Sequence, residues 1–201
     1  MSDKVLPKIA LFGGTFDPPH LAHLEVARAV RDQLAMDDVV WIPASRNPLK
    51  PMKEMAPPRK RLKMVELTIR EEPHMSLSDI EISRGGHSFT IETLMELREI
   101  MPSQFWIMVG SDALDQILDW KSYDKLFRFA RFAAVLRPPH DRSRALLHVP
   151  DDFHEQIDFV EMPPMTHSGT QIRDFVERGE PYDHLVTPAV QQYIQENKLY
   201  V

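Results

Sequence analysis

The sequence of 201 residues contains no cysteine, which excludes disulfide bonds, thiol catalysis and metal sites built from thiolates. No apolar run approaches the roughly 20 residues that are needed to cross a bilayer. The first residues also lack the apolar core of a signal peptide. We therefore expect a cytoplasmic protein that has no membrane partner.

Glycine is scarce and proline is abundant, with 7 glycines against 17 prolines. The prolines are scattered between apolar segments, which indicates fixed turns and not disorder. An apolar content of 43% and a charged content of 27% are typical of a globular protein. We expect residues 1–201 to form a single domain, because this length is sufficient for one core.

The net charge of −6 argues against nonspecific binding to nucleic acid, which needs a broad basic face. It does not argue against a nucleotide substrate, for which a small local group of cations is sufficient. Such a group is formed by Lys50, Lys53, Arg59, Lys60, Arg61 and Lys63. The alternative is that these side chains belong to a solvated linker and helix face.

Short apolar runs alternate with stretches of helical periodicity. The runs predict strands at residues 8–12, 39–42, 76–83, 105–109, 132–136 and 158–162. Helices are predicted at residues 23–34, 59–71, 90–101, 170–177 and 188–197, with Thr90 as a cap and a long loop at 45–58. This alternation favours an α/β fold with a doubly wound, mainly parallel sheet. In such sheets ligands bind at the carboxyl ends of the strands, so the chemical residues should follow strands.

The segment after the first predicted strand combines two glycines with two histidines. Gly13 and Gly14 let the backbone approach a ligand closely, and the next helix begins near His20 with N–H groups and a dipole that favour an anion. His20 and His23 are three residues apart and project from one side of the first turn. Together they form a suitable cradle for a polyphosphate.

Each of these features has a simpler explanation when it is taken singly. Two glycines often form only a turn, and a histidine at a helix start is often a cap or a surface residue. The histidines could also form a metal pair, although no third ligand stands at a suitable spacing. Neither the G-x-G-x-x-G fingerprint nor a P-loop is present. The combination of strand, glycines, threonine and histidine pair is what favours a nucleotide site.

The segment Gly-Gly-Thr-Phe-Asp-Pro-Pro-His-Leu-Ala-His resembles the signature of the bacterial nicotinate-nucleotide adenylyltransferases, G-G-T-F-D-P-x-H-x-G-H. These enzymes belong to the nucleotidyltransferase superfamily that has the H-x-G-H motif. The glycine between the two histidines of the family is Ala22 in this sequence. The resemblance implies a Rossmann-like nucleotidyltransferase fold.

Five further segments resemble family motifs in the family's order. They are Asn47–Lys50, Gly86–Leu94, Val109–Asp112 with Trp120, Arg137, and His167–Arg173. Each has an ordinary structural explanation by itself. Trp120 could be a core residue, Asp112 a helix cap and Arg137 a partner of a surface acid, and Ser168 and Thr170 are good N-cap residues.

The resemblance implies transfer of the adenylyl group of ATP to nicotinate mononucleotide, with Mg²⁺ delivered by ATP and no dedicated metal site. Catalytic roles are implied for His20, His23, Lys50 and Arg173. Binding roles are implied for Gly13, Gly14, Thr15, Phe16, Gly110, Asp112, Ser168, Thr170, Phe89, Thr90, Trp120 and Arg137, of which Phe89, Thr90, Trp120 and Arg137 would surround the pyridine nucleotide.

Other functions stay open at this point. A pantetheine-phosphate adenylyltransferase or a cytidylyltransferase of the same superfamily would share the histidine pair. A class I aminoacyl-tRNA synthetase also uses such a pair, but the short length, the acidic charge and the absence of a K-M-S-K-S-like loop argue against it. The chain could also be a nucleotide-binding regulator without catalytic activity. A homo-oligomer is possible, since composition does not determine the oligomeric state.

Overall fold

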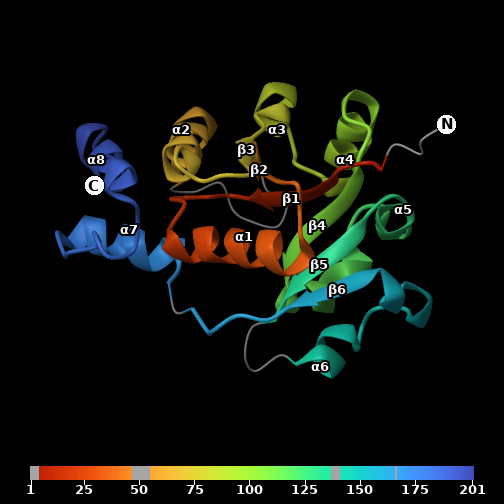
Figure 1. Cartoon of the computed structure of the whole chain (residues 1–201). Helices are drawn as coiled ribbons and strands as arrows, with labels where there is room; N and C mark the ends of the chain where they lie inside the picture. The colour runs from red at the N-terminus through yellow and green to blue at the C-terminus, as the bar shows by residue number, and fades with distance from the viewer. Residues whose placement is uncertain (1–4, 47–54, 137–140, 166) are drawn as a thin grey trace.

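A computed structural model describes residues 5–46, 55–136, 141–165 and 167–201 (Figure 1). Its centre is a sheet of six strands, β1 (Lys8–Gly14), β2 (Asp38–Pro43), β3 (Met75–Leu77), β4 (Gln104–Gly110), β5 (Arg131–Val135) and β6 (Ile157–Val160). The strand order is β3-β2-β1-β4-β5-β6 and every neighbouring pair is parallel. This is the strand order of the Rossmann fold, so the predicted fold class is confirmed. The order reverses between β1 and β4, where such sheets bind ligands.

Helices cover both faces of this sheet. In chain order they are α1 (Leu21–Leu34), α2 (Pro58–Ile69), α3 (Ile80–Arg84), α4 (Thr90–Ile100), α5 (Tyr123–Phe129), α6 (Arg142–Leu146), α7 (Gly169–Arg178) and α8 (Pro188–Glu196). Two 3₁₀ segments, η1 (Ser111–Asp119) and η2 (Asp151–Gln156), complete the described elements. None of the helices in these four ranges has the length and apolar character that a membrane span requires.

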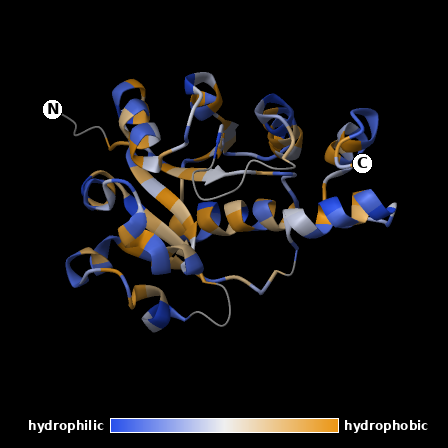
Figure 2. Ribbon diagram, turned by 180° about the vertical axis from the view of Figure 1, so that it is seen from behind, coloured by the Kyte–Doolittle hydropathy of each residue, from blue (hydrophilic) through white to orange (hydrophobic). Residues whose placement is uncertain are grey.

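Alternation along the strands separates two apolar layers. In β1, Ile9 and Leu11 pack with Leu94 of α4 and Leu126 of α5, whereas Ala10 packs with α1 and α2 on the opposite face. The central strands are accordingly mostly hydrophobic, while α7 is mostly hydrophilic (Figure 2). Burial of both faces explains why the strands were recognisable as continuous apolar runs.

A third cluster joins α7 and α8 to α2 at one end of the sheet (Figure 1). Met64 of α2, Ile172 of α7 and Ile194 of α8 are each at most 1% exposed in it. The first backbone N–H of α1, at Leu21, also donates to the carbonyl oxygen of Leu185 at 2.9 Å. The segment before α8 is therefore fixed against the start of α1.

Most predicted elements are confirmed to within two residues at each end, but the strand predicted at 76–83 is wrong. Only Met75–Leu77 is a strand, and Ile80–Arg84 form α3. Ser78 N donates the last ladder bond to Trp41 O at 2.9 Å, after which Ser83 N turns back to Asp79 O at 2.8 Å. The alternation of apolar residues predicts a strand, but residues 79–83 lie beyond the last hydrogen bond between this segment and β2.

Several shorter features also differ from the predictions. Thr90 is the first residue of α4 and Phe89 is its N-cap, without a side-chain cap bond, so the capping role predicted for Thr90 is wrong. The helices α5 and α6 and both 3₁₀ segments were not predicted. Most of the loop predicted at 45–58 lies outside the described residues, and α2 begins at Pro58, where proline is favoured in a first turn.

Candidate functional site

A cleft of about 1020 Å³ opens at the carboxyl ends of the strands. Gly14 at the end of β1 and Gly110 at the end of β4 line it, as do the starts of α1, α4 and α7. The cleft brings together the predicted residues Gly13, Gly14, Thr15, Phe16, His20, His23, Phe89, Thr90, Gly110, Asp112, Trp120, Ser168, Thr170 and Arg173. Lys50 and Arg137 lie outside the described residues. The predicted location of the site, after the strands, agrees with this geometry.

The loop between β1 and α1 is tightly packed. Phe16 has a φ of +50° and the Asp17–Pro18 peptide bond is cis. A Cβ atom on Gly14 would come within 2.8 Å of the Phe16 ring, so a larger residue at this position would have to displace that ring. The Phe16 side chain is 2% exposed and lies 5.1 Å from the Trp41 ring, between centroids. Phe16 therefore supports the floor of the cleft from the core.

The two histidines stack at the beginning of α1. Their ring centroids are 3.7 Å apart at an interplanar angle of 29°. His20 is the N-cap residue, and its backbone N–H donates to Nδ1 of His23 at 3.2 Å. Because Nδ1 accepts this bond, a neutral His23 ring carries its proton on Nε2, which makes Nε2 the donor nitrogen.

The N-terminus of α7 packs against the same loop. Ser168 caps α7, with its Oγ accepting from Gln171 N at 3.2 Å, as its residue type indicated. Nη1 of Arg173 donates to the carbonyl oxygen of Asp17 at 2.7 Å, and Nη2 donates to Thr170 Oγ1 at 3.3 Å. The starts of α1 and α7 thus both line one cleft, and each carries the positive end of a helix dipole.

Gly169 allows this close approach, and its replacement is a test of the arrangement. A Cβ atom at this position would lie 2.8 Å from the backbone oxygen of Asp17, and backbone cannot move as a flexible side chain does. If the cleft binds ATP, as the resemblance implies, Gly169→Ala should raise the KM for ATP about tenfold, because a displacement of α7 moves Arg173. Steady-state kinetics with Glu177→Ala, an exposed residue near the end of the same helix and outside this cleft, provides the comparison. Equal kinetics for Gly169→Ala and the wild type would contradict the expectation.

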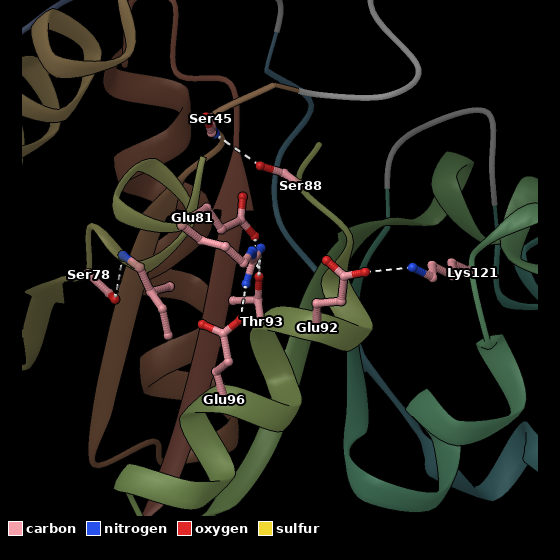
Figure 3. A network of polar contacts seen from close by, with 10 residues as sticks. Ser45, Ser78, Glu81, Ser88, Glu92, Thr93, Glu96 and Lys121 are labelled. Carbon is pink, nitrogen blue, oxygen red and sulfur yellow. Dashed lines mark hydrogen bonds and ion pairs between the residues drawn. The ribbon is translucent and has the colours of Figure 1, made fainter. Parts of the chain in front are cut away.

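Phe89, Thr90 and Trp120, three of the residues predicted to surround a pyridine ring, line the same cleft. Trp120 ends η1 and packs half-buried against the first apolar cluster, while Phe89 lies at the start of α4. The Nζ atom of Lys121 lies 4.4 Å from the centroid of the Phe89 ring. The same atom lies 2.5 Å from Oε1 of Glu92 (Figure 3). Lys121 is not among the predicted site residues, although it directly follows Trp120.

A buried carboxylate in this wall was also missed. Glu81 is 6% exposed and accepts a hydrogen bond from Thr93 Oγ1 at 2.7 Å. Arg84 donates to the same Thr93 oxygen at 3.0 Å and pairs with Glu96 at 2.7 Å (Figure 3). These contacts join α3 to α4. Glu81 was not predicted as a site residue, because a strand at 76–83 gives no indication that Glu81 contacts Thr93 of α4.

Arg61 fits neither of the two roles considered for the six cations, which were nucleotide binding and a solvated linker or helix face. Its side chain is neither solvated nor directed to a ligand, because the residue is 1% exposed. Its guanidinium donates to the backbone oxygens of Thr15 at 2.7 Å, Ala56 at 2.9 Å and Ser45 at 3.2 Å. Burial lowers the pKa of Arg61 below its ordinary value. Arg61 therefore links α2 to the loop after β1 and to the end of β2.

Comparison with known proteins places the chain among enzymes. The cytidylyltransferase-like family matches residues 11–175. A Tropheryma whipplei (strain Twist) protein named "Probable nicotinate-nucleotide adenylyltransferase" is 40% identical over 189 residues, covering 94% of this chain and 97% of that protein. A Salinibacter ruber protein of the same name is 38% identical over 194 residues, covering 96% of this chain and 97% of that protein.

Solved structures agree with this assignment at the level of the fold. The Plasmodium falciparum nicotinic acid mononucleotide adenylyltransferase complexed with NaAD has a TM-score of 0.78 at 21% identity, over 96% of this chain and 97% of that chain. Its complex with APC gives a TM-score of 0.77 at 20% identity, with the same coverage of both chains. With full-length relatives at up to 40% identity, the chain belongs to the nicotinate-nucleotide adenylyltransferase family, within the cytidylyltransferase-like group.

Proposed function

We propose that this protein transfers the adenylyl group of ATP to nicotinate mononucleotide, giving nicotinate adenine dinucleotide and pyrophosphate. The observation that carries the proposal is a single cleft that is lined both by the helix N-termini with the histidine pair and Arg173 and by the aromatic side chains of Phe89 and Trp120. Relatives of nearly the same length bear the name of this activity. The reaction is a step of NAD biosynthesis. We also propose that residues 1–201 form one nucleotidyltransferase domain.

The reaction needs no general base. The 5′-phosphate of nicotinate mononucleotide is already an anion at neutral pH, and one of its oxygens attacks the α-phosphorus of ATP in line. A new P–O bond forms while the bond between the α-phosphorus and the bridging oxygen breaks, and pyrophosphate leaves with that oxygen. Catalysis then consists of positioning and of stabilising charge on the phosphoryl oxygens.

The histidine pair and Arg173 supply that stabilisation in our proposal. His20 and His23 donate hydrogen bonds to the triphosphate beside the N-terminus of α1, and Arg173 adds positive charge from α7. Gly13, Gly14, Thr15, Gly110, Asp112, Ser168 and Thr170 line the nucleotide part of the cleft. Family resemblance adds Lys50 as a further cation at the phosphates.

Magnesium enters this scheme as a part of its substrate, the MgATP complex. In the part of the chain that the structure describes, no three histidine or carboxylate side chains cluster as metal ligands. The triphosphate itself offers oxygen ligands of the kind Mg²⁺ prefers.

The pyridine end favours the acid over the amide. Trp120 and Phe89 offer aromatic faces for the nicotinate ring, and the backbone N–H groups at the start of α4, near Thr90, suit its carboxylate. Lys121 adds a positive charge beside Phe89. Arg137 joins this group by family resemblance.

This preference gives the test of the proposed function. We expect kcat/KM for nicotinate mononucleotide to exceed that for its amide by about tenfold or more, because donors bind a charged carboxylate more strongly than a neutral amide. The purified protein is incubated with MgATP and either substrate, and dinucleotide and pyrophosphate are followed by chromatography. Equal turnover of both would overturn the preference and keep adenylyl transfer. No turnover of either, with ATP still bound, would overturn the second substrate, and phosphopantetheine would be tried next.

A further inference from the structure

Tyr200, which follows α8, reaches the loop between β1 and α1 although it lies 183 residues from Asp17 in the sequence. Its hydroxyl donates to Oδ1 of Asp17 at 2.6 Å. We propose that Tyr200 is a positioning residue for the phosphates of ATP, which acts through the carboxylate of Asp17. The inference rests on the proposed binding of ATP at this loop.

Asp17 is the point at which four segments meet. Besides the Tyr200 hydroxyl, its Oδ1 accepts the backbone N–H of Ala56, just before α2, at 3.1 Å. Its main-chain oxygen accepts Nη1 of Arg173 from α7 at 2.7 Å. His20, the N-cap of α1, is only three residues further along the chain. The position of Asp17 therefore determines how the histidine pair and Arg173 are placed relative to each other.

The Asp17 carboxylate depends on few partners. The residue is 6% exposed, and its Oδ2 has no hydrogen-bond partner among the described residues, with the nearest cation, Nη1 of Arg173, at 3.8 Å. A buried carboxylate requires donors, because water is excluded from it. Loss of one of the two donors at Oδ1 should thus displace the side chain and the loop that carries it.

The Tyr200 hydroxyl is fixed as a donor. Burial of the phenol, and the neighbouring Asp17 carboxylate, raise the pKa of Tyr200 far above its ordinary value. The proton therefore stays on the hydroxyl at any physiological pH. An ionised carboxylate beside it accepts a charge-assisted bond, which is stronger than a bond between neutral groups.

The backbone around Tyr200 is held in an uncommon conformation to make this contact. Tyr200 has a φ of +65°, in the left-handed region that residues other than glycine seldom adopt. Leu199 is 7% exposed in the third apolar cluster, which joins α7 and α8 to α2. Its N–H donates to Ile194 O at 3.0 Å. Neighbouring packing thus compensates the strain, which is typical of residues that serve a site.

The two ends of the cleft should respond differently if Tyr200 acts in this way. The Asp17 contacts reach α2, α7 and the start of α1, which we assign to ATP. Trp120 and Phe89, which we assign to the pyridine nucleotide, are the C-cap residue of η1 and the N-cap residue of α4. Removal of the hydroxyl should therefore weaken binding of ATP and leave binding of the second substrate unchanged, whereas a general loss of structure would weaken both.

The test uses Tyr200→Phe, which keeps the ring and removes only the hydroxyl. We expect the affinity for the magnesium complex of α,β-methylene-ATP, measured by calorimetry, to fall about tenfold, the scale of one hydrogen bond to a charged group. The KM for ATP should rise similarly, and the KM for nicotinate mononucleotide should change less than about twofold. In an Asp17→Asn background, Tyr200→Phe should have much less effect, because the two residues act as a pair.

Tyr182→Phe is the matched control, because Tyr182 is 7% exposed in the third apolar cluster and its hydroxyl bonds to Gln195, outside the cleft. We expect it to bind the ATP analogue as the wild type does. The proposal is overturned if Tyr200→Phe binds the analogue normally, if both tyrosine variants lose affinity equally, or if the KM values of both substrates rise together with a fall in Tm. The calorimetry needs no second substrate, so failure of the wild type to use nicotinate mononucleotide would refute the proposed function separately.

Discussion

His20→Ala should lower kcat by roughly 10²-fold or more, the scale of losing one donor to a transition state. The side chain is 6% exposed at the beginning of α1 and stacks on His23, so alanine removes both the donor and the surface that orients the second ring. Single-turnover measurements with MgATP and nicotinate mononucleotide would report the chemical step directly.

His184→Ala is a suitable control for this variant. The His184 side chain is 62% exposed and lies beside Asp183, outside the cleft, so its loss should leave kcat unchanged. Turnover of His20→Ala near the wild-type rate would exclude His20 from the catalytic role. A similar fall in both variants would indicate an effect of the substitution that is unrelated to the site.

Arg61→Met should reduce the free energy of unfolding by about 3 kcal/mol, because it leaves buried carbonyl oxygens without their donor. The three oxygens belong to Thr15, Ser45 and Ala56, which lie in three separate segments of the chain. Arg61→Lys should fall between the wild type and Arg61→Met, since one ammonium group lacks the planar fork that reaches three acceptors. Urea-induced unfolding, monitored by circular dichroism, measures the difference.

Arg59→Met provides the matched comparison, because Arg59 is an exposed residue on the same helix. Its replacement should change the free energy of unfolding by no more than about 0.5 kcal/mol. If the two methionine variants unfold at the same urea concentration, the buried guanidinium does not stabilise the fold. The KM for ATP of Arg61→Met should also rise, because Thr15 lies in the loop that we assign to phosphate.

Local sequence determined the region from β1 to α1 and most of the sheet. A strand followed by Gly13, Gly14 and the histidine pair is a pattern within about 15 residues, and its geometry depends on neighbours along the chain. Strands buried on both faces are continuous apolar runs, which periodicity detects. Those predicted nucleotide and pyridine residues that the structure describes therefore line one cleft, because parallel strands bring their carboxyl ends to one edge.

Tertiary contacts determined the structure of segments that hydrophobic periodicity did not predict correctly. Ile80–Arg84 form a helix although their alternation suggested a strand, and Glu81 there bonds to Thr93 of α4. Local pattern carries no information on such a partner. The short helices α5 and α6 and the 3₁₀ segments were missed for the related reason that a few residues hold too little periodicity.

The polar contacts of Asp17 and Arg61 also depend on the tertiary structure and not on local sequence. Sequence alone identified Asp17 only as one letter of a motif and left Arg61 in a group of cations. The fold brings Tyr200 to Asp17 across 183 residues and buries Arg61 against three backbone oxygens. Amino-acid sequence determined most of this protein's strands, its longer helices and the motif residues of the cleft, because these depend on near neighbours. Only the tertiary structure decided which residues hold the reacting groups in place, because hydrogen bonds between distant segments form once the chain has folded.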